Sequence, residues 1–189
     1  LDREWVRQAI GQARLLPQVP RLMLPPAAGK TAKNWRAYRG RFVEPVRIRE
    51  GLRFWASNAD AVRRASQRYG VPEEILVSII GVETIYGRNT GNFETLSTLA
   101  TLAFDYPPRA ELFRRELEAL FLLAREQARD PASYSGSFAG ALGYPQFLPS
   151  SIRAYAVDFD RSGQIDFDND PVDAIGSVAN YLRAHGWQT

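Results

Sequence analysis

Apolar residues return every third or fourth position along most of the chain, and this period predicts a mainly α protein. The widest apolar stripe lies in residues 109–129 and is typical of a helix that faces the core: Leu112, Phe113, Leu117, Leu120, Phe121 and Ala124. Further helices are predicted over 2–16, 50–69, 96–103, from a cap at Ser150 or Ser151 to Ala156, and from Val172 to Gly186. Prolines and Gly29 interrupt residues 17–33, which predicts a loop or hinge at a lobe boundary.

Residues 72–88 are predicted to form the helix around which the chain is organised. Pro72 suits the first helical position, the two acidic residues after it complement the helix dipole, and Gly87 suits the stop. Leu76, Ile80 and Glu83 fall on one line of this helix, so the Glu83 carboxyl continues an apolar stripe. A second apolar stripe is predicted beside it: Ile75, Ile79, Val82 and Tyr86.

The position of Glu83 has a chemical consequence. Desolvation disfavours the charged form of a carboxyl and raises its pKa, which suits a general acid that works near neutral pH. The alternative is a structural Glu at the edge of the core, or one paired with Arg88.

Composition narrows the class of protein. A chain of 189 residues, 45% of them hydrophobic, is long enough for one core with at most a small appended lobe. The chain has no apolar run of membrane-spanning length and its first residues lack the features of a signal peptide, so we expect a mature fragment. The formal net charge of +3 favours anionic surroundings, whereas the dispersed arginines argue against nucleic acid.

Two residue types limit the chemistry further. The absence of cysteine excludes disulfide scaffolds, thiol catalysis and thiolate zinc sites. The lone histidine, His185, precedes Gly186 and is interpreted as a residue that caps the end of a helix. A Ser-His-Asp hydrolase or a multi-histidine metal enzyme would have to be built on this one imidazole, so carboxylate chemistry remains the main option.

Two stretches have the composition of a sugar-binding surface. Trp35, Tyr38 and Phe42 recur among arginines, which suits a stacking or anionic surface but equally a core-edge helix with a solvated basic face. In residues 135–151 small residues permit close backbone approach, and rings and an amide suit a sugar: Phe138, Tyr144, Gln146 and Phe147. The alternative for the second stretch is an ordinary glycine-rich loop. Arg109, at the start of its helix, could project towards a cleft.

Residues 158–173 begin with the oxygen spacing and the central glycine of a calcium loop. A standard loop of this kind closes with a glutamate at its twelfth position, where this chain has Asn169. Calcium binding is therefore predicted for a longer loop closed by Asp173. The alternative is a solvated acidic turn in which Asp170 caps the following helix.

Four ordered blocks together resemble the membrane-bound lytic transglycosylase B family: GVETIYGR, LATLAFDYPPRAELF, GSFAGALGYPQFLPSS and YAVDFDRSGQIDFDNDPVDAIGSVANYLRAHGW. The resemblance covers nearly the whole chain. It implies a mainly α fold with a lysozyme-like helical core, an N-terminal helical lobe and an EF-hand-like calcium loop. On this basis we expect the lobe in residues 1–58 and the catalytic core in 59–189, including the loop 158–173. Members of the family usually continue beyond the HGW segment, so we expect a fragment that lacks their C-terminal extension.

The resemblance also assigns roles to residues. It implies that Glu83 is the catalytic acid/base. Substrate-binding roles follow for eight residues: Tyr38, Arg109, Ser137, Phe138, Tyr144, Gln146, Phe147 and Tyr181. The metal ligands implied are Asp158, Asp160, Ser162, Gln164 through its carbonyl, and Asp173. Structural calcium is the one cofactor implied, with no organic cofactor.

The activity implied is cleavage of the bond between N-acetylmuramic acid and N-acetylglucosamine in peptidoglycan, with formation of 1,6-anhydromuramic acid ends. A hydrolytic muramidase and a catalytically silent peptidoglycan-binding fragment are the alternatives. We expect glycan strands as the partner, together with a monomeric state and contacts with other cell-wall enzymes. The expected location is the periplasm or bacterial cell envelope, with an outer-membrane anchor through a lipidated N-terminus absent from this chain.

Overall fold

The computed structural model describes residues 1–24 and 34–188. The chain divides into two compact units, each assembled from two stretches of sequence. Unit 1 is Leu1–Leu24 with Thr90–Ala154, and unit 2 is Pro25–Asn89 with Tyr155–Thr189. This division differs from the sequential segments 1–58 and 59–189 expected from the sequence, because the chain leaves unit 1 and later returns to it.

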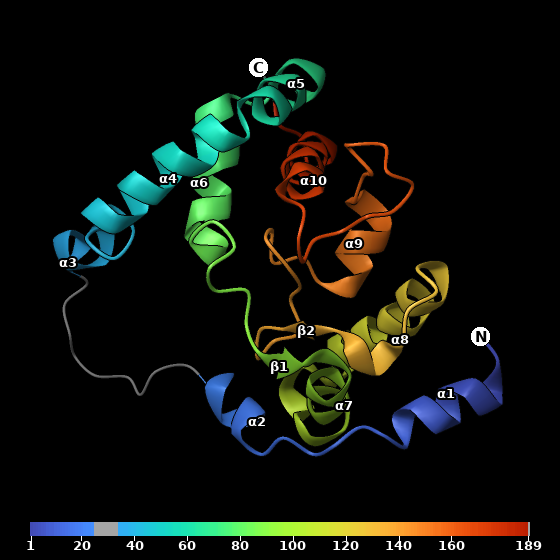
Figure 1. Ribbon diagram of the computed structural model, residues 1–189. Helices are drawn as coiled ribbons and strands as arrows, with labels where there is room; N and C mark the ends of the chain where they lie inside the picture. The colour runs from blue at the N-terminus through green and yellow to red at the C-terminus, as the bar shows by residue number, and fades with distance from the viewer. Residues whose placement is uncertain (25–33, 189) are drawn as a thin grey trace. The chain divides into compact units, whose positions relative to one another are not determined.

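Unit 1 is built from helices with one small sheet (Figure 1). Its helices are α1 (Arg3–Ile10), α2 (Gln18–Leu22), α7 (Thr95–Asp105), η1 (Pro107–Arg109), α8 (Ala110–Glu126), η2 (Pro131–Ser133) and α9 (Pro149–Tyr155). Its two strands, β1 (Phe93–Glu94) and β2 (Ser135–Gly136), pair antiparallel, with Phe93 opposite Gly136.

The core of unit 1 lies between α7 and α8, which pack against each other. Leu96, Leu99 and Leu102 of α7 are fully buried, as is Leu120 of α8. The predicted stripe of α8 is confirmed except at its first position, because Leu112 is 41% exposed. Hydroxyl groups of α7 also hold the segment after α1. Arg14 N donates to Ser97 Oγ and Leu16 N donates to Thr101 Oγ1.

Unit 2 contains five helices among the residues described (Figure 1). They are α3 (Trp35–Arg39), α4 (Pro45–Ser57), α5 (Ala59–Tyr69), α6 (Glu73–Thr84) and α10 (Pro171–Ala184). Helix α10 packs against α5 and α6, and α4 packs against α6. Their facing sides form the core of the unit: Val62, Ala65, Leu76, Ile80, Ile175 and Val178.

Several helix boundaries differ from those predicted. The single helix predicted over 50–69 is two helices, because Asn58 leaves the helical conformation and its Nδ2 donates to Phe54 O. The first helix ends at Ile10, and α2 lies within the segment predicted to be a loop. The remainder of that predicted loop, residues 25–33, lies outside the described residues.

The start of α9 also differs from the prediction of a serine cap. Pro149 is the first helical residue, so Ser150 lies inside the helix. Ser150 N and Ser150 Oγ donate to the carboxylate of Glu116, at 3.0 and 2.6 Å. A buried carboxylate from α8 therefore accepts the hydrogen bonds that the first turn of α9 donates through Ser150. Within the described part of the chain, no helix combines the length and apolarity needed to cross a membrane.

Candidate functional site

Glu83 lies in the last turn of α6, which ends earlier than predicted. Helix α6 stops at Thr84 because Ile85, Tyr86 and Gly87 all adopt left-handed backbone conformations. Leu76 and Ile80 are fully buried, which confirms the stripe that leads to Glu83. The second predicted stripe is incomplete, since Val82 is 47% exposed and Tyr86 lies beyond the helix.

The surroundings of Glu83 fit the role of an acid. Its side chain reaches solvent, yet the protein around it withdraws enough water to raise the pKa of the carboxyl. Burial is the cause of this rise, without a contribution from a second carboxylate. Among the residues described, Glu83 has no hydrogen-bond or ion-pair partner. Arg88, the alternative partner considered from the sequence, pairs with Glu50 at 3.4 Å instead.

Two predicted binding residues lie in the same unit as Glu83. Tyr38 on α3 is 54% exposed, and its ring lies 5.8 Å from that of Trp35 and 5.2 Å from that of Phe42. Tyr181 on α10 stacks on His185, with ring centroids 4.0 Å apart. His185 caps the end of α10, which confirms the role predicted for this histidine.

Residues 137–147 of unit 1 form a tight loop in which Ser137 and Gln146 bond to backbone groups of the loop and of Thr90. Ser137 Oγ accepts hydrogen bonds from Ala139 N and Ala141 N. Gln146 Nε2 donates to Thr90 O and to Gly143 O, both at 3.0 Å. These bonds use both amide hydrogens of Gln146, so its Oε1 is the atom left to meet a ligand.

The other predicted residues of unit 1 differ in exposure. The ring of Phe138 is 36% exposed, whereas that of Phe147 is only 9% exposed, so Phe147 shapes the loop more than it offers surface. Tyr144 is partly buried. Arg109 is exposed at the end of η1, and its guanidinium has no hydrogen bond or ion pair with the residues that the structure describes.

The predicted residues thus fall into two groups. Unit 2 carries Glu83, Tyr38, Tyr181 and the acidic loop, and unit 1 carries the rest: Arg109, Ser137, Phe138, Tyr144, Gln146 and Phe147.

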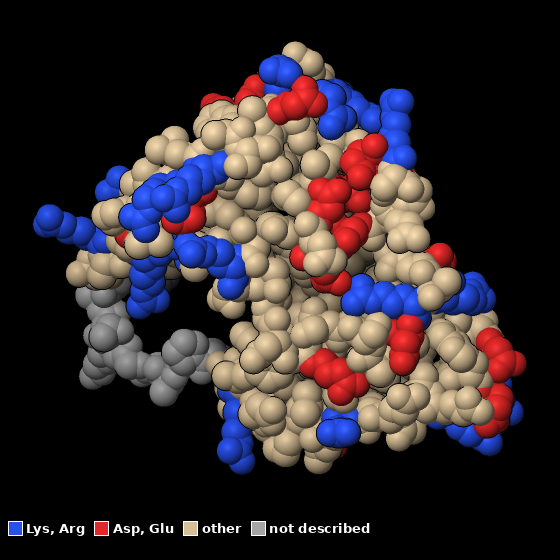
Figure 2. Space-filling model, viewed as in Figure 1, with Lys and Arg blue, Asp and Glu red and all other residues tan. Residues whose placement is uncertain are grey.

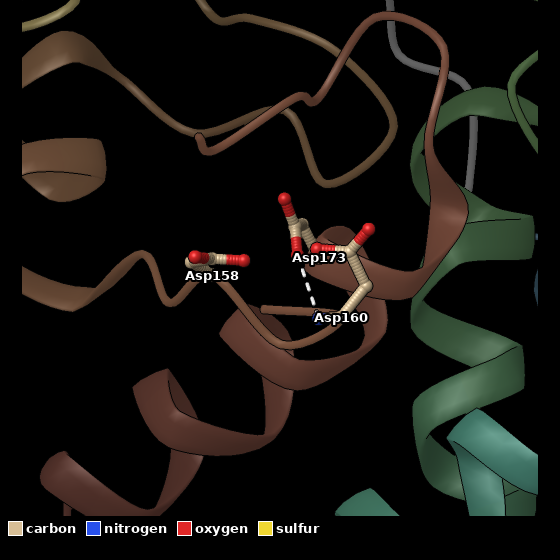
Figure 3. Close-up of side chains that lie close together, drawn as sticks. All are labelled: Asp158, Asp160 and Asp173. Carbon is tan, nitrogen blue, oxygen red and sulfur yellow. Dashed lines mark hydrogen bonds between the residues drawn. The ribbon is translucent and has the colours of Figure 1, made fainter. Parts of the chain in front are cut away.

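The acidic segment before α10 brings three of its predicted ligands together. Acidic side chains gather on the surface over this segment (Figure 2). One carboxylate oxygen from each of Asp158, Asp160 and Asp173 lies within 4.8 Å of the others. Figure 3 shows the three side chains. Asp158 and Asp160 come from the start of the loop, and Asp173 comes from the first turn of α10.

The backbone of the loop is folded around these carboxylates. Ser162 N and Gly163 N donate to Asp158, and Phe159 N and Asp166 N donate to Asp173. Burial raises the pKa of the Asp173 carboxyl, whose side chain is 1% exposed. Ser162 Oγ donates to Gln164 O, so the remaining two predicted ligands belong to the same turn. All five predicted ligand atoms are oxygens, the type of atom that calcium prefers.

Asp170 accepts a hydrogen bond from Val172 N at the start of α10, so it caps this helix as the alternative interpretation assumed. This cap and the carboxylate cluster therefore exist together in one loop.

Two structural features escaped the sequence analysis. Tyr86 was expected to continue the helix, but it lies beyond the helix end in a left-handed conformation. Glu116 was missed because it is polar within an apolar stripe. Its spacing from Phe113 and Leu120 on α8 could have indicated a buried carboxylate.

The fold and these side chains define a mainly helical protein in which one carboxyl is suited to acid/base chemistry. A model of the family described as "Transglycosylase SLT domain" matches residues 1–189. The chain therefore belongs to this family, which confirms the membership predicted from the four sequence blocks.

Three known proteins illustrate the relationship. The chain is 50% identical over 194 residues to membrane-bound lytic murein transglycosylase B of Escherichia coli strain K12, covering 98% of this chain and 53% of that protein. It is 49% identical to soluble lytic transglycosylase SltB1 of Pseudomonas aeruginosa, with a TM-score of 0.95 over 100% of this chain and 63% of that one. It is 50% identical to E. coli lytic transglycosylase Slt35 in complex with calcium, with a TM-score of 0.91 over 100% of this chain and 59% of that one. The chain thus spans between half and two thirds of the length of these relatives.

Proposed function

We propose that this chain cleaves the β-1,4 bond between N-acetylmuramic acid and N-acetylglucosamine in peptidoglycan and leaves 1,6-anhydromuramic acid ends. The observation that carries the proposal is the Glu83 carboxyl, which ends a buried helical stripe, has a raised pKa and has no partner among the described residues. The names of the relatives, which are murein transglycosylases at about half identity, support the substrate and the reaction.

In the proposed mechanism Glu83 acts twice. Its carboxyl first donates a proton to the glycosidic oxygen, and the C–O bond to the anomeric carbon of the muramoyl sugar breaks. The carboxylate then takes the proton from the 6-hydroxyl of the same sugar, whose oxygen attacks the anomeric carbon. No water is consumed, so a second carboxylate to activate water is not needed, in contrast to most glycosidases.

We assign the binding of glycan strands to the residues proposed from the sequence, with roles set by their observed bonding. The Gln146 Oε1 can accept from a sugar hydroxyl or an acetamido N–H. The exposed ring faces of Tyr38 and Phe138 suit stacking on sugars, and Tyr181 offers an aromatic edge already fixed by His185. Arg109 suits a carboxylate of the substrate. Ser137, Tyr144 and Phe147 support the shape of the loop.

We further propose that the acidic loop of unit 2 holds calcium in an EF-hand-like manner. Asp158, Asp160 and Asp173 would supply carboxylate oxygens, and Ser162 and the Gln164 carbonyl would complete the protein ligands. Bound calcium would offset the mutual repulsion of the three carboxylates and would tie the loop to α10. The calcium complex of Slt35 supports this proposal.

The name of the E. coli relative, a membrane-bound murein transglycosylase, supports a location of the proposed activity in the bacterial cell envelope. A periplasmic location, a lipid anchor, a monomeric state and contacts with other cell-wall enzymes stay predictions from the sequence.

Digestion of purified sacculi tests the function. We expect soluble muropeptides that end in 1,6-anhydromuramic acid, one water lighter by mass spectrometry than the hydrolytic product. Glu83→Gln should lower turnover by a factor of about 100 or more while glycan binding persists, because the amide keeps the shape but cannot carry the proton. Reducing-end products would support the muramidase alternative. Binding without any product would support the silent fragment, and full turnover by folded Glu83→Gln would remove Glu83 from the mechanism.

A further inference from the structure

The turn that follows Glu83 has an unusual backbone. Ile85 has φ of 53° and Tyr86 has φ of 59°, so two consecutive residues with side chains occupy the left-handed region. This region is unfavourable for residues other than glycine, and most of all for β-branched residues such as isoleucine. Such a conformation persists only where the surrounding structure holds it.

The ring of Tyr86 is seated against two glycines that belong to different helices. A Cβ added to Gly51 on α4 would lie 2.9 Å from Tyr86 Cζ, and one added to Gly81 on α6 would lie 2.9 Å from Tyr86 Cε1. Both distances are shorter than real Cβ contacts allow. The ring of Phe54 on α4 lies 5.3 Å from that of Tyr86 and closes the seat. The ring can therefore occupy this position only while both neighbours lack a side chain.

Polar contacts hold the same turn from its other sides. Arg47 Nη1 donates to Gly81 O at 2.6 Å, which links α4 to a terminal carbonyl of α6. Gly87 N donates to Thr84 Oγ1, and Asn89 N donates to Thr84 O. The turn is thus fixed by α4 as well as by its own residues.

We propose that Tyr86 is a positioning residue for Glu83: its ring, seated on Gly51 and Gly81, locks the left-handed turn and thereby the orientation of the Glu83 carboxyl. This inference rests on the proposed role of Glu83 as the acid/base. No described side chain bonds to that carboxyl, so its direction depends on the backbone at the end of α6. A displacement of about 1 Å at a reacting group can lower a rate by a factor of about 100.

The first test compares Tyr86→Ala with Tyr86→Phe in the whole chain, by sacculus digestion and by the pH dependence of turnover. Tyr86→Ala is expected to lower kcat about 10- to 100-fold with little change in KM. Tyr86→Phe should restore most of this loss, because the phenylalanine ring occupies the same seat. The basic limb of the pH profile should move to lower pH in Tyr86→Ala, since a displaced carboxyl is better solvated.

The charged groups around the turn, Arg47 on α4 and the Glu50–Arg88 ion pair, are retained in every variant. A shift of the basic limb therefore reports the exposure of Glu83 rather than a lost charge. Tyr69→Ala is the matched control, because Tyr69 is another partly buried tyrosine of unit 2 whose ring packs on Phe159. It should lower the melting temperature and leave kcat and the pH profile of the folded protein unchanged.

A double-mutant cycle covers the case in which Tyr86→Ala does not fold. Gly51→Ala adds a methyl group on α4 whose three nearest atoms all belong to the ring and hydroxyl of Tyr86. It should lower kcat when introduced into the parent. In a protein that already carries Tyr86→Leu it should not lower kcat further, because leucine leaves the space of the ring tip empty. Unchanged kcat and pH profile in folded Tyr86→Ala or Gly51→Ala would overturn the inference. Full activity of Glu83→Gln would instead overturn the proposed function on which it rests.

Discussion

The protonation of Glu83 is linked to the stability of the fold. Burial raises the pKa of its carboxyl in the folded protein, so folding favours the protonated form. The stability that this preference contributes is fully present below the pKa of Glu83 in the unfolded chain, and it is lost as pH rises through the pKa in the folded protein. Glu83→Gln cannot ionise, so we expect it to be more resistant to urea than the parent at pH 7, and this advantage to shrink towards about pH 4.

Glu118→Gln is the control for this measurement, since Glu118 is exposed on α8 and its substitution removes the same formal charge. The difference in urea midpoint between Glu83→Gln and the parent should depend on pH more strongly than that of the control. An equal and constant difference for both variants would contradict the link between folding and the Glu83 proton.

The sequence predicted those surroundings of Glu83 that depend on residues close to it in the chain, and missed those that depend on distant residues. The burial of Leu76 and Ile80 follows from helical spacing, which is local, and it correctly predicted a carboxyl with a raised pKa. The left-handed Ile85 did not follow, because nothing local favours that conformation in a β-branched residue. The contacts that hold it involve Gly51 of α4, which lies far from it in the sequence.

The junction of α8 and α9 depends on one buried carboxylate. Glu116 is 6% exposed and accepts from both the backbone N–H and the hydroxyl of Ser150. Glu116→Ala would leave both donors without this partner in the first turn of α9. We expect a loss of about 2 kcal/mol in the free energy of unfolding, because two hydrogen bonds to a buried carboxyl are removed. Urea unfolding followed by circular dichroism measures this loss.

Glu118→Ala, two residues further along α8, is the matched control, because the same side chain is removed from an exposed position. It should change the free energy of unfolding by no more than about 0.5 kcal/mol. If the two variants were equally stable, the contact between Glu116 and Ser150 would not stabilise the junction of the two helices.

Helices were predicted better than their ends. The apolar stripes of α7 and α8 predicted both helices, since helical periodicity is a local property of the sequence. The break between α4 and α5 was missed because the stripe continues across Asn58, whose side chain bonds to Phe54 O and ends α4. The start of α9 was misplaced for a different reason, because its partner Glu116 lies on another helix.

The arrangement of the chain into two units was the least predictable feature. Each unit combines an early and a late stretch of sequence, so α10 completes a core with α5 and α6. Proline-rich composition indicates where a chain bends, but it does not indicate which later segment returns to which core. The acidic loop was easier to predict, because the spacing of Asp158 and Asp160 is local and the closing Asp173 lies at the start of the next helix.

Calcium is expected to stabilise the molecule through this loop. A ligand that binds only the folded state adds about 2.7 kcal/mol of stability when its free concentration is one hundred times its dissociation constant. The melting temperature of protein first stripped of metal should therefore rise with calcium and rise less with magnesium, which requires a tighter octahedral shell and loses water reluctantly. Hydrogen exchange should slow over α5, α6 and α10, the helices of the core that the loop adjoins.

Two aspartates of the same loop provide a matched pair for this test. Asp158→Asn removes a carboxylate of the cluster and should abolish the calcium-dependent rise, while the Glu83 chemistry persists at temperatures where the variant is folded. Asp168→Asn removes the same charge from outside the cluster and should keep most of the rise, because the ligand set is intact. An equal response of both variants would indicate general charge screening rather than a site. Identical melting curves of the parent in calcium and in chelator would return the loop to a solvated acidic turn.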